Sequence, residues 1–262
     1  MSLGIYLFCL TPENPLPEVT GTGIDGEHPL FAEAIGNVAA ILSEVALEDF
    51  SGSESRERME NLAWIGPRAL RHEEVIMAVM RRSPVLPVRF GTVFSSIEAM
   101  AEPLRRHRDT LSKFFRDTAG KKEWCIRAYV DMQQTRAQIM AARLTAEKEQ
   151  LAGLSPGKRY FLEQKIKGTV DRDVTSWLKG IANDIMMSVK EASSAFSERR
   201  LLSQEVTGGD SKMFFHGAFL VSDRSVETLQ GLIGEWNTLH EPQGLRLELS
   251  GPWPPYHFAP VL

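Results

Sequence analysis

The first part of the chain alternates short apolar runs with polar stretches rich in proline and glycine. The apolar run at residues 3–10 predicts a buried strand, and residues 11–29 predict a polar loop. Residues 29–45 predict two strands that meet at Gly36-Asn37, a dipeptide typical of a hairpin turn. The pattern therefore begins with a strand followed by a hairpin.

Helical spacing follows the hairpin. It begins after the acidic stretch 51–60, and Pro67 suits the first turn of a helix that Pro84 ends. Residues 85–94 then predict an apolar strand, and a further helix stops at Gly120. This half of the chain thus predicts an α+β sandwich with its helices on one face of the sheet.

The pattern restarts after residue 120. Residues 121–132 predict a strand, and residues 133–202 predict a mostly helical region. A strand at 212–223, a helix at 226–240 and an alternating strand at 245–250 complete this half. The helical region carries one apolar stripe at steps of three and four residues, made of Val170, Val174, Trp177, Ile181, Ile185, Val189, Ala192 and Phe196.

These patterns predict two α+β domains, one at residues 1–120 and one at residues 121–262. Each is expected to contain an antiparallel sheet with helices on one face. The second domain also contains long helices and a tail, residues 251–260, in which four residues are proline and three are aromatic. Proline removes backbone donors, so this tail is expected to be neither a helix nor a central strand.

Composition narrows the functional classes. The formal net charge is −4, and 43% of the residues are hydrophobic and 24% are charged, which is typical of a globular protein. A basic footprint for nucleic acid or for an anionic membrane is absent from this balance. No stretch has the apolar length needed to cross a bilayer, and Cys9 and Cys125 lie in apolar runs that favour buried, reduced thiols of a cytoplasmic protein.

The sequence offers little that predicts catalysis. It contains no nucleophile elbow, and its two cysteines and scattered histidines have no metal-ligand spacing, so we expect no metal and no organic cofactor. His72 precedes Glu73 and Glu74 on a predicted helix. The interpretation that we favour is a histidine at the edge of the core with two solvated glutamates, rather than an acid–base or metal site.

Arg89 is the most informative charged residue. In an unbroken strand over residues 85–94, Arg89 and Gly91 would share an apolar face and Phe90 would lie on the other. An arginine among apolar residues requires a carboxylate or carbonyl partner. Two interpretations remain open with equal weight, an internal ion pair that fixes the sheet or an anchor for another protein.

Two proline-bearing motifs resemble a known family. PVLPVRFGTVF at residues 84–94 and GPWPPYHF at residues 251–258 resemble the gas vesicle assembly proteins of the F and L type. Further segments agree in the same order, namely GIYLFCL, VAAILSEV, RHEEVI, KRYFLEQK and GAFLVSD. The resemblance covers nearly the whole chain and does not separate the F branch from the L branch.

The resemblance implies a non-enzymatic accessory protein that acts in the cytoplasm during gas vesicle formation. It implies two ferredoxin-like halves, and contacts with the hydrophobic gas vesicle shell protein and with other accessory proteins. Arg89, Phe90, Gly91, Trp253 and Tyr256 are the residues in its motifs that we expect to serve as interaction or structural groups. We expect Trp253 and Tyr256 to pack against the C-terminal domain, because two free aromatic rings would promote aggregation.

Two rival functions remain. A ferredoxin-like fold also hosts small-molecule sites and enzymes, for which Arg89, His72 and Tyr256 are the candidate polar groups. A minor structural component of the vesicle wall is the other rival.

Overall fold

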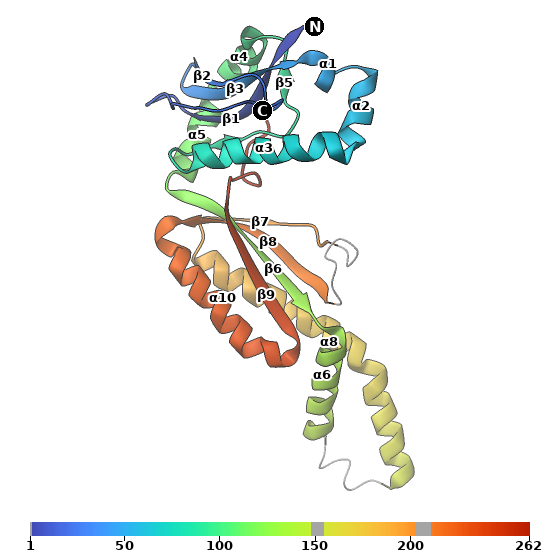
Figure 1. Ribbon diagram of the computed structural model, residues 1–262. Coiled ribbons are helices and arrows are strands. Elements are labelled where there is room, and N and C mark those ends of the chain that lie inside the picture. The colour runs from blue at the N-terminus through green and yellow to red at the C-terminus, as the bar shows by residue number, and fades with distance from the viewer. Residues whose placement is uncertain (1, 148–154, 203–210) are drawn as a thin grey trace. The chain divides into compact units, whose positions relative to one another are not determined.

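The computed structural model describes residues 2–147, 155–202 and 211–262 (Figure 1). It has an α+β fold with two antiparallel sheets, as the sequence predicted. The chain forms two compact units. The first unit contains Met1–Glu123 together with Pro252–Leu262, and the second contains Trp124–Gly251.

The first unit is built on a five-stranded sheet in which β2, β3, β1 and β4 are neighbours in that order and β5 also pairs with β1. The confirmed hairpin joins β2 and β3, and its turn places Gly36 at a φ of 68°, which glycine adopts without strain. The elements are β1 (Leu3–Pro12), β2 (Leu30–Ile35), β3 (Val38–Ala46), α1 (Leu47–Phe50), α2 (Ser53–Glu60), α3 (Leu62–Met80), β4 (Leu86–Pro87), β5 (Val93–Phe94), α4 (Ile97–Arg106) and α5 (Arg108–Thr118).

A bulge in β1 decides which side chains face which helices. Leu7 pairs with Leu42 and Cys9 pairs with Ile41, so Phe8 is an extra residue in β1. Tyr6 and Phe8 lie in the core cluster of α3, whereas Leu7 lies in the cluster of α4 and α5.

Helices cover both faces of the first sheet, whereas the sequence pattern predicted helices on one face only. Helix α3 covers one face with Val75, Ile76 and Val79, and Figure 1 shows α3 running along the sheet. Helices α4 and α5 cover the other face, with Met100, Leu104, Leu111, Phe114 and Phe115. The physical reason lies in β1 and β3, which are apolar at consecutive positions and therefore expose apolar side chains on both faces of the sheet.

Three local predictions in this unit were wrong. Helical structure begins at Leu47 rather than after residue 60, and α3 begins at Leu62, so Pro67 lies inside the helix rather than in its first turn. The predicted strand over residues 85–94 is two short strands, β4 and β5, separated by a turn at Gly91 with a φ of 82°. A left-handed φ cannot continue a strand, which explains the interruption.

The second unit contains a four-stranded sheet in the order β7, β8, β6 and β9. Its elements are β6 (Lys121–Val130), α6 (Met132–Ala146), α8 (Pro156–Glu191), β7 (Ala195–Glu198), β8 (Lys212–Ser222), α10 (Val226–His240) and β9 (Leu245–Trp253), with 3-10 turns at Asp223–Ser225 and Glu241–Gln243. With α6 and α8 counted as one helical hairpin, these elements follow the β-α-β-β-α-β order of a ferredoxin-like domain. The first unit does not follow that order, because its first three strands are consecutive.

Helices α8 and α10 pack on one face of the second sheet (Figure 1). The apolar stripe predicted for α8 is buried at Val170, Val174, Ile181, Ile185 and Val189. The assignment of Phe196, the last residue of the predicted stripe, to the helix was wrong. Helix α8 ends at Glu191, and Phe196 lies in β7, a strand that the sequence did not predict. The predicted turn at residues 205–212 lies almost entirely outside the described residues.

The buried stripe of α8 provides a test of the second core. Ile185 is fully buried, whereas Met187, two residues away on the same helix, is 51% exposed. Ile185→Ala is expected to lower the free energy of unfolding by about 2–5 kcal/mol, because it removes buried methyl groups and leaves a cavity. Met187→Ala is the matched control and should cost less than about 1 kcal/mol. Urea unfolding of both variants measures the difference, and equal costs would contradict this packing.

Candidate interaction site around helix α3

Helix α3 is the element around which the candidate site is built. It begins at an Asn61 cap whose side chain accepts a hydrogen bond from the backbone of Ala63 at 3.0 Å. At 100° per residue its surface divides into three faces. The buried face carries His72, Val75, Ile76 and Val79. A second face, the groove side, carries Arg71, Glu74 and Ala78, with Arg82 just beyond the helix end. A third face, the tail side, carries Leu62, Gly66, Ala69, Leu70 and Glu73.

The buried face ends in a hydrogen-bonded chain of polar groups. The Tyr6 hydroxyl lies 2.9 Å from Nδ1 of His72, and Nε2 of His72 lies 3.1 Å from the carbonyl oxygen of Val88. The backbone N–H of Gly91 donates to the Tyr6 oxygen at 3.1 Å. Because a carbonyl oxygen only accepts, Nε2 carries the proton and Nδ1 accepts from the Tyr6 hydroxyl. This chain joins β1, α3 and the turn after β4.

Burial keeps the His72 ring neutral. Removal from water lowers the pKa of His72 to about 4, although the hydrogen bond to Val88 acts in the opposite direction. Burial likewise raises the pKa of Tyr6, against the opposing effect of the Gly91 hydrogen bond. Both groups are therefore uncharged at neutral pH. His72 therefore belongs to the core, as we expected, whereas Glu73, which we expected to be solvated, is half-buried and bonded to Tyr256.

The motif at residues 88–91 separates its two large side chains. Phe90 turns inward, and its ring centroid lies 5.7 Å from that of His72 and 6.3 Å from that of Tyr6. Gly91 supplies the left-handed turn that brings its own N–H to Tyr6. Arg89 points outward and is exposed. These positions make Phe90 and Gly91 structural parts of the site.

The prediction that the Arg89 side chain binds a carboxylate or a carbonyl oxygen of the protein was wrong. Its side chain makes no hydrogen bond or ion pair with any residue that the structure describes, and only its carbonyl oxygen is engaged, by Thr92. The prediction assumed an unbroken strand with Arg89 on an apolar face. The turn at Gly91 instead places this arginine in solvent, where a guanidinium needs no protein partner.

The C-terminal tail docks on the first unit rather than on the second, which corrects our expectation. The Tyr256 hydroxyl donates to the Glu73 carboxylate at 2.9 Å, and the ring packs against the core cluster of α3. Burial, and then the charge of Glu73, raise the pKa of Tyr256. Ala259 packs against the cluster on the other face of the same sheet. The tail residues therefore belong to the first hydrophobic core, although they follow the second unit in sequence.

A second polar contact holds the tail. The backbone N–H of His257 donates to the Glu123 carboxylate at 2.9 Å, and the His257 ring also contacts that carboxylate through Nδ1. Pro254 and Pro255 are buried just before it. Trp253, which we expected to be packed like Tyr256, is 38% exposed at the end of β9. Tyr256 is therefore the aromatic anchor of the tail, and Trp253 leaves part of its ring in solvent.

Apolar side chains are exposed on the tail side of α3. Leu62 is 83% exposed and Leu70 is 63% exposed, with Gly66 and Ala69 between them. No charged residue lies between positions 61 and 67. The exposed leucines lie on the same helix face as Glu73, to which Tyr256 is bonded. Exposed apolar side chains gathered on one helix face are typical of a surface that contacts another protein.

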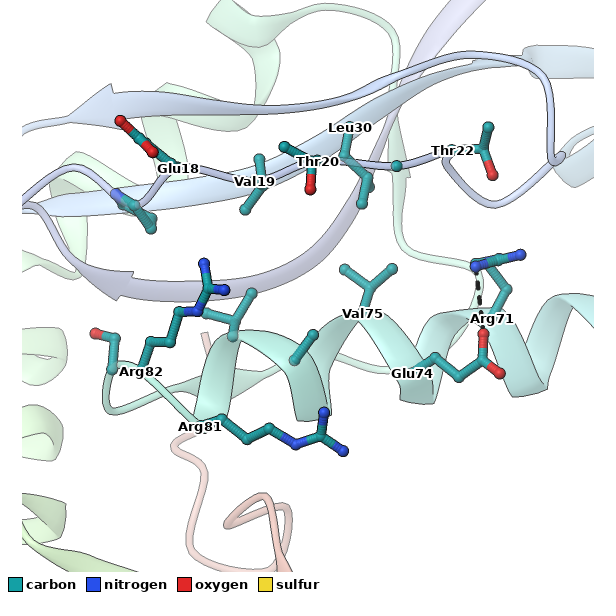
Figure 2. A pocket seen from close by; sticks show the side chains of 15 residues that line it. Glu18, Val19, Thr20, Thr22, Leu30, Arg71, Glu74, Val75, Arg81 and Arg82 are labelled. Carbon is teal, nitrogen blue, oxygen red and sulfur yellow. Dashed lines mark ion pairs between the residues drawn. The ribbon is translucent and has the colours of Figure 1, made fainter.

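A groove lies on the other flank of α3 (Figure 2). It has a cavity volume of about 360 Å³ and runs between residues 17–22 and the C-terminal half of the helix. Its apolar lining comes from Val19, Leu30, Val75, Ala78 and Val79, and its charged groups are Glu18, Arg71, Glu74, Arg81 and Arg82. Arg71 and Glu74 form an ion pair at 3.3 Å near one end, drawn as a dashed line in Figure 2.

Comparison with known proteins identifies the family. The family described as gas vesicle synthesis protein GvpL/GvpF matches residues 4–260. The chain belongs to this family. The GvpL/GvpF family is one of gas vesicle accessory proteins, and membership supports a role in gas vesicle assembly.

Similar proteins come from different groups of prokaryotes. The chain is 26% identical to gas vesicle protein L of a Streptomyces species over 264 residues, which cover 98% of this chain and 92% of that protein. It is 25% identical to gas vesicle protein F of Dolichospermum flosaquae over 225 residues, which cover 84% of this chain and 83% of that protein. The chain is therefore similar to relatives of both the L and the F type.

The fold is shared with a solved structure. A crystal structure of the gas vesicle protein GvpF from an Anabaena species superimposes with a TM-score of 0.74 at 21% identity, covering 100% of both chains. Within the part of the chain that the structure describes, no helix combines the length and the apolar character needed to span a membrane.

The predicted site residues are partly brought together. Phe90, Gly91 and Tyr256 all reach the surroundings of α3, while Arg89 and Trp253 point at least partly into solvent. Sequence reasoning missed Tyr6 and Glu73 as the groups that bind these motifs. Tyr6 was hidden in an apolar run, and the partner of Glu73 lies 183 positions away.

The neutral state of His72 predicts a pH-dependent stability. The pKa of His72 is about 4 in the folded protein and near 6.5 in the unfolded chain, so the unfolded chain binds more protons between these values. This contribution to stability is fully present above pH 6.5 and is lost as the pH falls toward 4, by about 3 kcal/mol in total. His72→Gln should flatten the fall in unfolding free energy across this window, as measured by urea unfolding at several pH values. Equal pH profiles of the variant and the natural protein would contradict a buried neutral imidazole.

The tail contact predicts a loss of stability when the hydroxyl is removed. Tyr256→Phe leaves the Glu73 carboxylate without its donor and is expected to cost about 1–2 kcal/mol. Thermal unfolding measures this loss. Tyr160→Phe, at an exposed tyrosine of α8, is the matched control and should leave the melting temperature unchanged. The same melting temperature for both variants would mean that the Tyr256 bond does not hold the tail.

Proposed function

We propose that this protein is a non-enzymatic accessory factor for gas vesicle formation that binds the hydrophobic shell protein and other accessory proteins during assembly. The single observation that carries the proposal is the family match, which extends over residues 4–260 and includes both proline-bearing motifs. The site of action is the cytoplasm, where the shell is built.

The exposed apolar face of α3 is the surface that we assign to the shell protein. A shell subunit must carry a large apolar surface to exclude water, and such a surface aggregates unless it is covered before assembly. Leu62 and Leu70 offer apolar area that is already exposed, on a helix that the His72 network and the core hold in place. A preformed apolar face costs little conformational entropy when it binds.

The enzyme alternative receives less support from the geometry. The polar groups named for it, Arg89, His72 and Tyr256, do not converge on one cavity. Arg89 is exposed, both ring nitrogens of His72 are engaged in hydrogen bonds, and the Tyr256 hydroxyl is bonded to Glu73. A catalytic site needs polar groups that are free to meet a substrate in a common pocket.

A complementation experiment tests the proposal. A strain in which this gene is deleted should make no intact gas vesicles, and the natural gene should restore them. The double variant Leu62→Ser, Leu70→Ser should fold normally but restore few vesicles, and should capture less shell protein in a pull-down. Buoyancy, electron microscopy and the amount of captured shell protein are the measurements.

The matched control is Leu239→Ser. Leu239 is 67% exposed on α10 of the second unit, so its substitution removes about as much exposed apolar area as Leu70→Ser alone, at a different place. It should restore vesicles fully. Normal vesicle formation in the deletion strain would refute the assembly role itself. Full activity of the double α3 variant would refute only the assignment of this surface.

A further inference from the structure

The groove beside α3 is lined on one side by unpaired main chain. Within the part of the chain that the structure describes, the backbone N–H and C=O groups of Glu18, Val19 and Thr20 have no hydrogen-bond partner. Pairing resumes at Gly21, whose carbonyl oxygen accepts from the N–H of Leu30 at 3.0 Å. Unpaired main chain of this kind is a template for the addition of a strand.

The charge at one end of the groove is also unpaired. Arg71 is neutralised by Glu74, whereas the side chains of Arg81 and Arg82 form no ion pair with any described residue. Figure 2 shows the Arg82 guanidinium extending from the helix end toward residues 18 and 19. The C-terminal end of a helix favours cations, which accounts for an arginine near this position. It does not account for a guanidinium directed into a groove that also carries free main-chain groups.

The dimensions of the groove fit a short extended peptide. Arg71 and Arg82 are eleven positions apart, which corresponds to about 16 Å along a helix. An extended chain advances about 3.3 Å per residue, so about five residues would span this distance. The buried side chains of Val75 and Val79 lie along the same length and offer contacts for apolar side chains.

We propose that this groove binds an extended segment of a partner protein that carries apolar side chains and ends in an acidic residue. The main chain of the segment pairs with Glu18–Thr20, its apolar side chains contact Val75 and Val79, and its carboxylate pairs with Arg82. This is strand addition with a charged anchor, in which main-chain bonds give affinity and the side-chain contacts give selectivity. The site is distinct from the exposed leucines of α3, because it lies on the opposite flank of the helix.

Fluorescence anisotropy with labelled peptides and the full-length protein tests this site. The probe is a peptide with a blocked C-terminus and the sequence Thr-Val-Thr-Val-Thr-Glu-Glu. One matched peptide carries glutamines in place of the glutamates, and another carries serines in place of the valines. The first peptide should bind, and each matched peptide should bind about tenfold more weakly, because each lacks one of the two recognition elements.

Variants of the protein locate the binding. Arg82→Gln should weaken binding of the acidic peptide about tenfold and leave binding of the glutamine peptide unchanged, because the lost partner is the carboxylate. Arg105→Gln, at an exposed arginine of α4, is the matched control and should change neither affinity. All three proteins should have the same melting temperature, since these arginines are exposed.

Three results would overturn the proposal. The first is no binding of the acidic peptide at millimolar concentration. The second is equal binding of the acidic and glutamine peptides to both the natural protein and Arg82→Gln. The third is equal binding of the serine peptide together with full displacement by inorganic phosphate at a similar concentration, which would indicate a simple anion site. None of these measurements involves the shell protein, so their outcome is independent of the complementation experiment.

Discussion

The neutral His72 ring is the contact on which the arrangement of the first unit depends. It is held between the Tyr6 hydroxyl and the Val88 carbonyl, and Tyr6 in turn accepts from Gly91. Each of these groups would be costly to bury alone, and together they satisfy one another. The bonds connect the first strand, the long helix and the turn that carries the sequence VRFG at residues 88–91 into one structure. The orientation of α3, and hence of its exposed faces, follows from this connection.

A single helix thus supports two different surfaces. The side of α3 that carries Leu62 and Leu70 is apolar, and it ends at Glu73, where the tail is bonded. The opposite flank is a groove in which the main chain of residues 18–20 and the side chains of Arg81 and Arg82 make no hydrogen bond or ion pair with any described residue. Because the buried face lies between these two flanks, one rigid helix can present both at once. An assembly factor with several partners requires such separate surfaces, since partners that compete for one surface cannot act together.

The sequence predicted the regular parts of the fold well. The hairpin at Gly36 and the buried stripe of α8 are local patterns with a fixed period, and both were found. The predictions were wrong where a local sequence pattern is compatible with two different structures. Phe196 continues the helical spacing but lies in a strand, and Arg89 fits an alternating strand that a left-handed glycine interrupts. Among the residues of the candidate site, the sequence motifs predicted Phe90, Gly91 and Tyr256. The groove was not predictable, because it forms between residues 17–22 and a helix about fifty positions later.

Because the tail packs in the first unit, the first unit cannot complete its core until the whole chain has been synthesised. Residues 252–262 fill part of a core whose other members lie before residue 124. That core stays incomplete while residues 124–251 are being synthesised, and during this time the apolar surface later covered by Tyr256 and Ala259 is open to water. Closing it requires a loop of the size of a whole domain, but the entropic cost of closure grows only with the logarithm of loop length. Prior folding of the second unit would reduce this cost further, because β6 and β9, the strands through which the chain leaves and returns, are neighbours in its sheet. Folding of the second unit is therefore expected to precede completion of the first core, because it brings residues 252–262 close to the strand that follows the first unit.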